Sequence, residues 1–422
     1  MKLMKKIFYV LLIFIIILPI FNNLSFATEL NAKSEAALLA ELSTGKIIYE
    51  KNAKEVRYPA STTKIMTALL TLENCELTDT ATVSHNALQL VPSGYSNANL
   101  QEGEILTIED LLYALLVKSA NEAANVLAEH ISGSIEEFSN MMNSRAKELG
   151  CENTNFVNPN GVHNENHYST AYDLFLIATE AMKNETFRKI VSTPTYTLPA
   201  TNKYPSADRS FPNTNDLIRV NKNNRADNYY YEDAIGIKTG YTKEAKNCLV
   251  AASNRDGLEF ITVVLGSSTN EDGLSERYLD TINMFDYGYE NYMQTNIVKE
   301  NDTIDTIEIK NGTKESKNMK VVIKDSIDAI VSKDLDINNI SPTINLNENL
   351  RAPISAGEKV GTISYSIDDI NYSSDLLAGS TVYEKTDISI YLIIAGLAIL
   401  LFAIILMPKK KHSRNKYYKK RK

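Results

Sequence analysis

The segment Pro59-Ala60-Ser61-Thr62-Thr63-Lys64 places a lysine three residues after a serine. If Ser61 opens a helix, Lys64 lies one turn later on the same face, within reach of the hydroxyl. A serine hydroxyl is a poor nucleophile until a base takes its proton, and a lysine can be that base when burial or a second cation favours its neutral form. The spacing therefore permits a serine nucleophile with a lysine base, although alone it is more often a helix start followed by a solvated lysine.

A hydroxyl and a carboxamide lie in Lys118-Ser119-Ala120-Asn121, between two predicted helices. Ser119 could relay a proton to a leaving amine, and Asn121 could orient a substrate amide or Lys64. Because serine and asparagine are also favoured at helix N-termini, this segment alone is an ordinary helix cap.

The segment Gly236-Ile237-Lys238-Thr239-Gly240-Tyr241-Thr242 lies on a predicted strand. Lys238 and Thr239 could bind a substrate carboxylate by charge and hydrogen bonding. Gly240 would let a ligand or a neighbouring helix approach the backbone closely. Taken alone, the segment is a strand that ends in a turn.

The three segments together, in this order, are similar to the signature of penicillin-binding proteins and class A β-lactamases. Over roughly residues 34–380 the chain resembles the low-molecular-mass penicillin-binding proteins that act as D-alanyl-D-alanine carboxypeptidases. Further segments typical of that family are Asn158-Pro159-Asn160-Gly161, residues 167–173, Val264-Leu265-Gly266, residues 286–289 and Arg351-Ala352-Pro353. In that family the terminal D-Ala-D-Ala amide of the peptidoglycan stem peptide acylates the serine, D-Ala leaves, and water releases the shortened peptide. β-Lactam antibiotics inhibit by acylating the same serine.

The resemblance implies a role for each matching residue. Four form the catalytic network: Ser61 as nucleophile, Lys64 as general base, and Ser119 and Asn121 in proton transfer. Five belong to substrate binding: Lys238 and Thr239 at the terminal carboxylate, Gly240, Tyr241 (whose backbone N–H forms the oxyanion hole with that of Ser61), and Arg277. For Arg277 a surface salt bridge is an equally good interpretation. The resemblance calls for no cofactor and no metal.

Hydrophobic patterning predicts strands, then a block of helices, then strands and a closing helix. The expected strands cover 36–40, 47–49, 233–240, 247–252 and 260–265, and the expected helices begin near Ser61 and cover 111–117, 122–131, 135–149, 170–182 and 276–289. This order and the resemblance give an α/β mixed fold with a β-lactamase/transpeptidase-like domain, in which a mainly antiparallel sheet is flanked by helices and carries an inserted helical subdomain. Short strand-like segments then indicate a small all-β C-terminal domain.

Both ends of the chain carry membrane signals. Lys2, Lys5 and Lys6, an apolar run and a small-x-small site predict a signal peptide over 1–27, and a retained anchor is the alternative. Residues 388–407 contain no charge and are about the length of a membrane-spanning helix. The basic tail at 408–422 places that end inside by the positive-inside rule. The expected protein is anchored in a bacterial cell membrane by one C-terminal transmembrane helix, with residues 28–295 (the catalytic domain) and 296–380 (the all-β domain) outside the cytoplasm. The better-known family members instead use an amphipathic C-terminal helix.

Charge and cysteine content narrow the function. Three of the 44 basic residues lie in 1–27 and nine in 408–422, so the segment between them carries a formal charge of −20. This charge argues against a nucleic-acid partner. The three cysteines, Cys75, Cys151 and Cys248, form no Cys-x-x-Cys pair and are expected to be separate and buried.

Other interpretations remain. A membrane-bound β-lactamase shares the three motifs and would need a carboxylate to activate water, for which Glu165 lies in a suitable loop. A non-catalytic β-lactam or wall-peptide sensor would use Ser61 as a trap, but the short tail shows no signalling domain. A zinc hydrolase built on His163 and His167 lacks the His-Glu-x-x-His pattern, and a Ser-His-Asp hydrolase lacks the Gly-x-Ser-x-Gly elbow.

Overall fold

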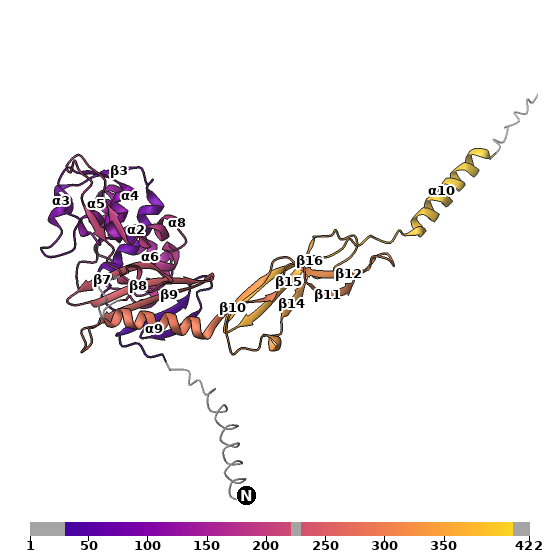
Figure 1. The fold of residues 1–422 in the computed structure, drawn as a ribbon. Helices are drawn as coiled ribbons and strands as arrows, with labels where there is room; N and C mark the ends of the chain where they lie inside the picture. The colour runs from indigo at the N-terminus through magenta and orange to yellow at the C-terminus, as the bar shows by residue number, and fades with distance from the viewer. Residues whose placement is uncertain (1–29, 221–228, 408–422) are drawn as a thin grey trace, which may run out of the picture. The chain divides into compact units, whose positions relative to one another are not determined.

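The computed structural model describes residues 30–220 and 229–407, and the predicted signal peptide and basic tail lie outside them. The chain divides into two compact units (Figure 1). The described part of the first unit ends at Gln294 and also takes in Ile330–Asp334, and the second contains Thr295–Ala329 and the chain from Leu335 onward.

A five-stranded antiparallel sheet forms the centre of the first unit. Its strands lie in the order β2 (Ile47–Lys51), β1 (Ala36–Glu41), β9 (Leu258–Ser267), β8 (Lys246–Arg255) and β7 (Ala234–Thr242). All five strands were predicted, with bounds that differ from the observed ones by at most three residues. The chain returns from the later strands to pair β9 with β1, which leaves β7 as an edge strand. An edge strand has backbone groups without a neighbour on one side, and the residues of the third motif lie on it.

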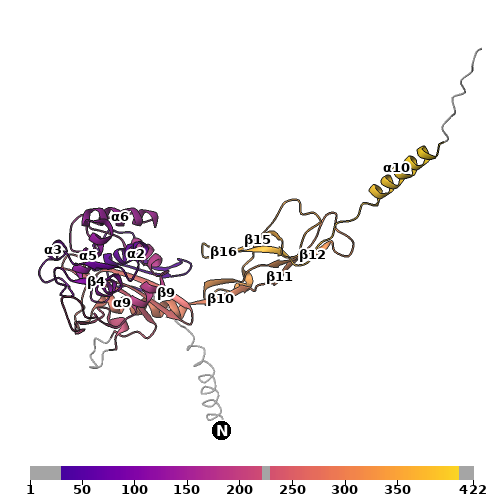
Figure 2. The ribbon, with the colours of Figure 1, turned by 90° about the horizontal axis from the view of Figure 1, so that it is seen from above.

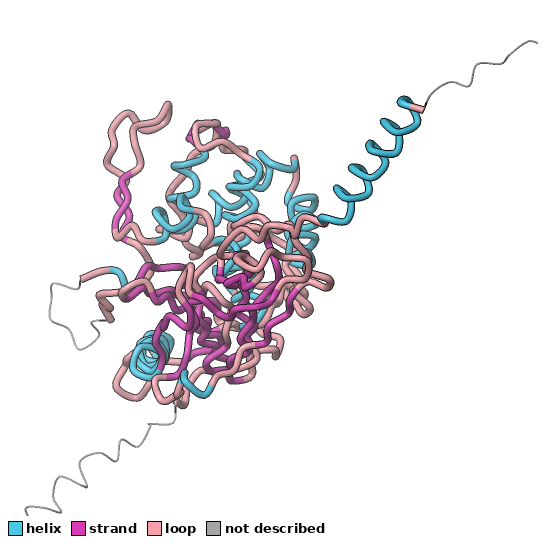
Figure 3. Tube along the Cα trace, turned by 90° about the vertical axis from the view of Figure 1, so that its right-hand side faces the viewer, coloured by secondary structure: helices cyan, strands magenta, loops and turns pink. Residues whose placement is uncertain are grey.

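Helices cover both faces of this sheet. Helix α9 (Glu276–Asn291) lies against one face and the helical block against the other (Figures 1 and 3). Leu39, Leu249 and Phe260 join the apolar cluster under α9, whereas Leu38 and Val250 join the cluster under the helical block. Neighbouring residues face opposite sides because side chains alternate along a strand. With both faces covered, β1 and β9 are apolar nearly throughout.

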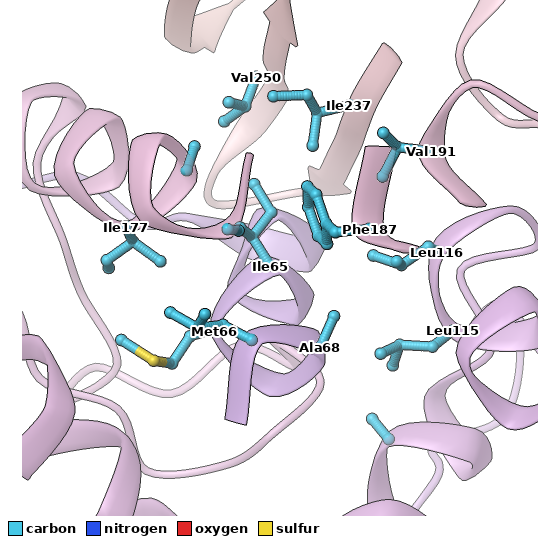
Figure 4. Close-up of a cluster of buried hydrophobic side chains, with 14 of the residues drawn as sticks. Ile65, Met66, Ala68, Leu115, Leu116, Ile177, Phe187, Val191, Ile237 and Val250 are labelled. Carbon is cyan, nitrogen blue, oxygen red and sulfur yellow. The ribbon is translucent and has the colours of Figure 1, made fainter. Parts of the chain in front are cut away.

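The helical block is built around α2 (Lys64–Asn74), which lies beside α5 (Figures 1 and 2). Ile65, Met66 and Ala68 of α2 point among side chains from several helices and from the sheet (Figure 4). The other helices are α3 (His85–Gln89), α4 (Ile108–Leu116), α5 (Asn121–Ser132), α6 (Ile135–Glu148), α7 (Ala171–Ala181) and α8 (Glu185–Val191). Helix α4 begins three residues earlier than predicted, because the side chain of Thr107 accepts from Asp110 N and caps the helix there.

Short elements complete the first unit. Two small hairpins pair β3 (Thr80–Thr82) with β4 (Ile105–Thr107) and β5 (Thr195–Thr197) with β6 (Ser210–Pro212), and 3-10 turns form η2 (Ala60–Thr63) and η3 (Asp216–Ile218). One expectation was wrong in detail: Ser61 lies in η2, and the α-helix begins only at Lys64.

The second unit contains the predicted all-β domain. Its antiparallel sheet has the order β11 (Thr303–Glu308), β12 (Asn318–Ile323), β16 (Ile370–Ala378), β15 (Lys359–Ile367) and β14 (Thr343–Leu346). Along β12, buried Met319, Val321 and Ile323 alternate with more exposed residues, so that one face of the sheet carries its apolar side chains. The strands β10 (Tyr292–Val298) and β13 (Ile327–Ser332) run across the division between the units, and η4 covers Ile337–Asn339.

Helix α10 (Ile388–Leu406) follows the all-β domain. It is long and apolar enough to cross a membrane by length and composition, and none of its side chains is buried in the structure. It has no polar face, unlike a helix that covers a soluble core.

Packing between α9 and the sheet predicts the effect of Gly288→Ala. A Cβ at Gly288 would lie 2.8 Å from the ring of Phe260. Because overpacking of this kind costs typically about 1–3 kcal/mol, the free energy of unfolding should fall by that amount in urea denaturation of the full-length protein in detergent. Asn283→Ala, at an exposed position of the same helix, should change it by less than about 0.5 kcal/mol. Equal stability of the two variants would contradict this packing.

Candidate active site

An open cleft of about 510 Å³ lies between the edge strand β7 and the helical block. Seven of the nine predicted site residues line it: Ser61, Ser119, Asn121, Thr239, Gly240, Tyr241 and Arg277. The other two, Lys64 and Lys238, are buried directly behind these residues. Tertiary structure therefore brings together all three motifs, which are separated by more than 50 residues from one to the next.

The Ser61 turn is held between two glycines. A Cβ at Gly161 would lie 1.9 Å from the carbonyl oxygen of Ala60, and a Cβ at Gly240 would lie 3.1 Å from the backbone nitrogen of Ser61. Ala60 has a φ of 49°, in the left-handed region that costs most residues about 1–2 kcal/mol. The backbone before the serine is thus pressed between the loop at Gly161 and strand β7, which places Ser61 at the cleft with little freedom to move.

Lys64 is fully buried and contacts three oxygen atoms. Its Nζ donates to Ser61 Oγ (3.0 Å), Asn121 Oδ1 (2.9 Å) and Asn160 O (2.6 Å). The Asn121 amide is oriented by its Nδ2, which donates to Ser96 O at 2.8 Å. Asn121 Oδ1 and Asn160 O can only accept, so a neutral amine would give them both its hydrogens. Its lone pair would then face Ser61.

Electrostatics favour that neutral amine. Burial lowers the pKa of Lys64 well below its usual value, the charge of Lys238 lowers it further, and Glu122 acts in the opposite direction. Burial disfavours the charged form of any group, and a second cation does the same to a lysine. Burial and a second cation, the two features that favour a neutral lysine, are therefore both present at Lys64.

Ser119 and Asn121 lie where α4 ends and α5 begins. Ser119 has a φ of 65° and its side chain is nearly buried at the cleft. Ala120 N donates to Ala114 O, and Asn121 N donates to Ser96 O. These backbone contacts satisfy donors at the helix break, where Asn121 contacts Lys64 and Ser119 lines the cleft.

Strand β7 supplies a cation and a hydroxyl. Lys238 is buried and donates to Thr239 O (3.0 Å), and Thr239 Oγ1 donates to Thr214 Oγ1 (2.7 Å). Burial, followed by the charge of Arg277, lowers the pKa of Lys238 to about 7. A carboxylate arriving beside Lys238 would favour its protonated form.

Arg277, from the first turn of α9, lines the cleft. Its Nη1 donates to Gly240 O (3.3 Å) and its Nη2 to Tyr278 OH (3.4 Å), while its buried Nε has no hydrogen-bond partner among the described residues. Among the described residues no carboxylate forms a salt bridge with it. The surface salt bridge considered for Arg277 is therefore absent from the described structure.

His167 is a buried structural residue. Its Nδ1 accepts from Val157 N (3.1 Å), so its Nε2 carries the proton and donates to Thr63 Oγ1 (2.8 Å). Burial, Lys64 and His163 lower the pKa of His167 to about 3, which keeps the ring neutral. Across the described ranges no cluster of potential metal ligands is found, and the zinc interpretation has no support.

Glu165 lies outside the cleft. It lines a separate cavity of about 310 Å³ together with Glu35 and Arg57, and it does not line the cleft that contains Ser61. The carboxylate that a β-lactamase interpretation required is therefore not presented to the serine from this position.

Several residues of the cleft region were missed from the sequence, and two of them contact predicted site residues directly. Thr214 lines the cleft and accepts from Thr239, and Asn160 contributes only its backbone oxygen to Lys64. Neither carries a compositional signal, since one is a loop threonine and the other acts through its main chain. Only the Asn158-Pro159-Asn160-Gly161 segment had drawn attention to this loop.

The three cysteines are free thiols, as expected. Cys151 and Cys248 are buried, but the expectation of burial was wrong for Cys75, which is half-buried. Burial raises the pKa of Cys248 to about 11, so this thiol stays protonated beside the cleft.

Comparison of the chain with known proteins identifies its family. A family model described as D-alanyl-D-alanine carboxypeptidase matches residues 23–269, more than half of the chain. The chain belongs to this family. A second model, described as the C-terminal domain of penicillin-binding protein 5, matches residues 292–384, which include the all-β sheet.

Individual relatives of this carboxypeptidase family agree with the assignment. The D-alanyl-D-alanine carboxypeptidase DacF of Bacillus subtilis is 35% identical over 398 residues, 91% of this chain and 95% of the relative. The structure of a peptidoglycan synthesis regulatory factor of Streptococcus pneumoniae, PBP3, has a TM-score of 0.69 at 26% identity and covers 83% of this chain and 100% of its own. The Streptomyces K15 DD-transpeptidase has a TM-score of 0.55 at 34% identity and covers 62% and 98%. The fold is that of a penicillin-binding protein with an all-β C-terminal domain.

The pKa of Lys238 provides a test of the site's electrostatics. Removing the Arg277 charge with Arg277→Ala should raise this pKa above its starting value near 7, because one of the two causes that lower it is lost. NMR titration of 13C-labelled lysine in the full-length protein, with Lys238→Met used to assign the signal, would measure it. Arg255→Ala, which removes a cation paired with Asp233 instead, should leave the titration unchanged. An unchanged pKa in Arg277→Ala would refute the coupling.

Proposed function

We propose that this protein is a serine-type D-alanyl-D-alanine carboxypeptidase, which removes the terminal D-Ala from peptidoglycan stem pentapeptides through an acyl-enzyme on Ser61. The observation that carries the proposal is the 3.0 Å contact between Ser61 Oγ and the buried amine of Lys64. Family membership supports the substrate class.

In the acylation step, neutral Lys64 takes the proton of Ser61 as Oγ attacks the carbonyl carbon of the penultimate D-Ala. The carbonyl oxygen becomes an oxyanion that the backbone N–H groups of Ser61 and Tyr241 stabilise. When the carbon–nitrogen bond breaks, the leaving D-Ala amine takes a proton from Lys64 by way of Ser119. An ester on Ser61 and a free D-Ala result.

In the deacylation step, water attacks the ester. Lys64, neutral again, accepts a proton from the water, and Ser61 Oγ leaves and is reprotonated. Asn121 holds the Lys64 amine throughout and is within the cleft, where it can also accept or donate to the substrate amide. The products are the shortened peptide and the starting enzyme.

The terminal carboxylate of the substrate binds at Lys238, Thr239 and Arg277. The Thr239 hydroxyl gives its one hydrogen to Thr214, so the hydrogen of the Thr214 hydroxyl is the one that this pair can donate to the carboxylate, and Thr214 belongs to the same set. Lys238 is buried and Arg277 is half-buried, and partial removal from water strengthens the attraction of a cation for a carboxylate. A carboxypeptidase needs such a site because its substrate ends in a free carboxylate.

β-Lactam antibiotics act as inhibitors by acylating Ser61. A penicillin presents a strained amide and a carboxylate, so the same groups bind it. Water then attacks this ester slowly. Glu165 lies away from the cleft, which favours slow release over the fast turnover of a β-lactamase. A non-catalytic sensor remains the second alternative, and release of D-Ala would exclude it.

The protein is proposed to act at the outer face of a bacterial cell membrane. A signal peptide at 1–27, a single transmembrane helix at 388–407 and a basic cytoplasmic tail at 408–422 would anchor it there. The apolar helix α10 supports this topology. The catalytic domain is assigned to 28–295 and the all-β domain to 296–380, both on the outside.

Mass spectrometry of the full-length protein in detergent tests the nucleophile. Incubation with penicillin should give a slowly released adduct on Ser61, and a D-Ala-D-Ala pentapeptide should lose one D-Ala. Ser61→Ala should abolish both reactions, whereas Ser206→Ala, on an exposed loop, should retain them. D-Ala release by Ser61→Ala at the parent rate would refute the assignment. Rapid destruction of penicillin by the parent would instead indicate a β-lactamase.

Substitution of Thr214 tests the carboxylate site. Thr214→Val keeps the branched shape and removes the hydroxyl, so KM for the pentapeptide should rise about 5- to 10-fold with little change in kcat, as expected for loss of one hydrogen bond made equally in the ground and transition states. Thr214→Ser should restore the parent KM. Steady-state assays of D-Ala release measure both constants, and an unchanged KM in Thr214→Val would show that the hydroxyl does not bind substrate.

A further inference from the structure

One wall of the cleft is the loop from Gly94 to Leu100, called here the cleft loop. Gly94, Tyr95 and Ser96 line the cleft opposite strand β7. Ala98 is fully buried and Leu100 nearly so. Loops that form the walls of binding sites are often the least stable parts of a fold, so what holds this loop determines the shape of the site.

Two neighbouring residues in the first turn of α5 hold the cleft loop. Asn121 donates to Ser96 O through both its backbone N (3.0 Å) and its Nδ2 (2.8 Å). Glu122 Oε1 accepts from Ala98 N (2.6 Å) and from Leu100 N (3.5 Å). The residue that contacts Lys64 is therefore followed directly by a carboxylate that binds the backbone of the cleft loop.

The Glu122 side chain is an unusual group to bury. It is only 2% exposed, and its Oε2 has no hydrogen-bond partner within the described ranges. To hold the cleft loop, only the contacts of Oε1 are needed, and the amide oxygen of a neutral glutamine could make them equally well. A buried carboxyl with a free oxygen costs stability unless a nearby positive charge compensates it.

Three basic side chains lie on the other side of Asn121. Lys64 from α2 donates a hydrogen bond to Asn121. The charge of Lys238 from β7 acts on Lys64, and the charge of Arg277 from α9 acts on Lys238. His167, from the loop after Gly161, is neutral. Glu122 is the acidic group that acts on Lys64 from α5.

We propose that Glu122 is a positioning residue with two roles, fixing the cleft loop through Ala98 and Leu100 and setting the charge state of Lys64. The inference rests on the proposed function, in which Lys64 is the base for Ser61. The carboxylate of Glu122 thus fixes the shape of the cleft wall on one side of Asn121 and influences the protonation of Lys64 on the other side. Glu122 itself does not touch the reacting atoms.

The sign of the electrostatic effect follows from the charges. An ionised Glu122 favours protonated Lys64 and so raises its pKa, against burial and Lys238, which lower it. Burial raises the pKa of Glu122, while its backbone hydrogen bonds and the attraction of Lys64 oppose this. Acylation requires neutral Lys64, so the rate of acylation should fall below the pKa of Lys64 in the free protein.

The test is the pH dependence of the second-order rate constant for acylation of the full-length protein by a fluorescent penicillin. Glu122→Gln keeps an oxygen that accepts from Ala98 N and removes the charge. Its acid limb should therefore move to lower pH by about 1 unit. Glu122→Asp keeps the charge on a side chain too short for Ala98 N, so its rate constant should fall with the acid limb near that of the parent.

Glu129→Gln provides a matched control on the same helix. Glu129 accepts from Ser84 and Asn86 at the far end of α5, and its variant should follow the parent profile. An acid limb in Glu122→Gln at the parent pH would overturn the electrostatic role, and a parent rate constant in Glu122→Asp would overturn the loop role, even if Glu122→Gln failed to fold. A parent protein that penicillin does not acylate would instead refute the proposed function.

Discussion

Two lysine side chains buried in the floor of one cleft are the constraint on which the site depends. Lys64 and Lys238 are at most 1% exposed. Burial and a neighbouring cation lower the pKa of each lysine. Removing an ammonium group from water is costly, so burial favours the neutral form of each amine. A lysine with that property can act as a base, which a solvated lysine cannot.

The fold supplies what this constraint needs. Every hydrogen-bonding position of Lys64 is met by a different element: the Ser61 turn, the start of α5 and the loop at Asn160. Lys238 lies on the edge strand β7, whose backbone on the cleft side is not covered by another strand of the described chain. The close approach of Gly161 and Gly240 to the Ser61 turn ties the helical block to the sheet at the point where both lysines are buried.

Elements with strong local signals were predictable. The alternating or continuous apolar runs of β1, β7, β8 and β9 and the stripes of α5, α6, α7 and α9 require burial of one face or both, which leaves few other conformations. Short elements were not: α3 and α8 span too few residues for a periodicity to emerge, and they are stabilised by packing and by caps at Ser84 and Asn184. The Ser61 turn was expected to be α-helical, because a separation of three residues brings Ser61 and Lys64 together in an α-helix and in a 3-10 turn alike.

By itself, the sequence determined the chemistry available to this protein, since Ser61, Lys64, Lys238 and the other motif residues are distinctive in type, spacing and order. It also determined the strands of the first unit, the all-β domain and the apolar segment at 388–407, because hydrophobic patterning is a local property. Only the tertiary structure decided that Thr214 and the backbone of Asn160 join the site, that Glu165 does not, and that Glu122 holds the cleft loop. These depend on distances between residues far apart in the chain and on how much water packing excludes, neither of which is encoded in the spacing of any one segment.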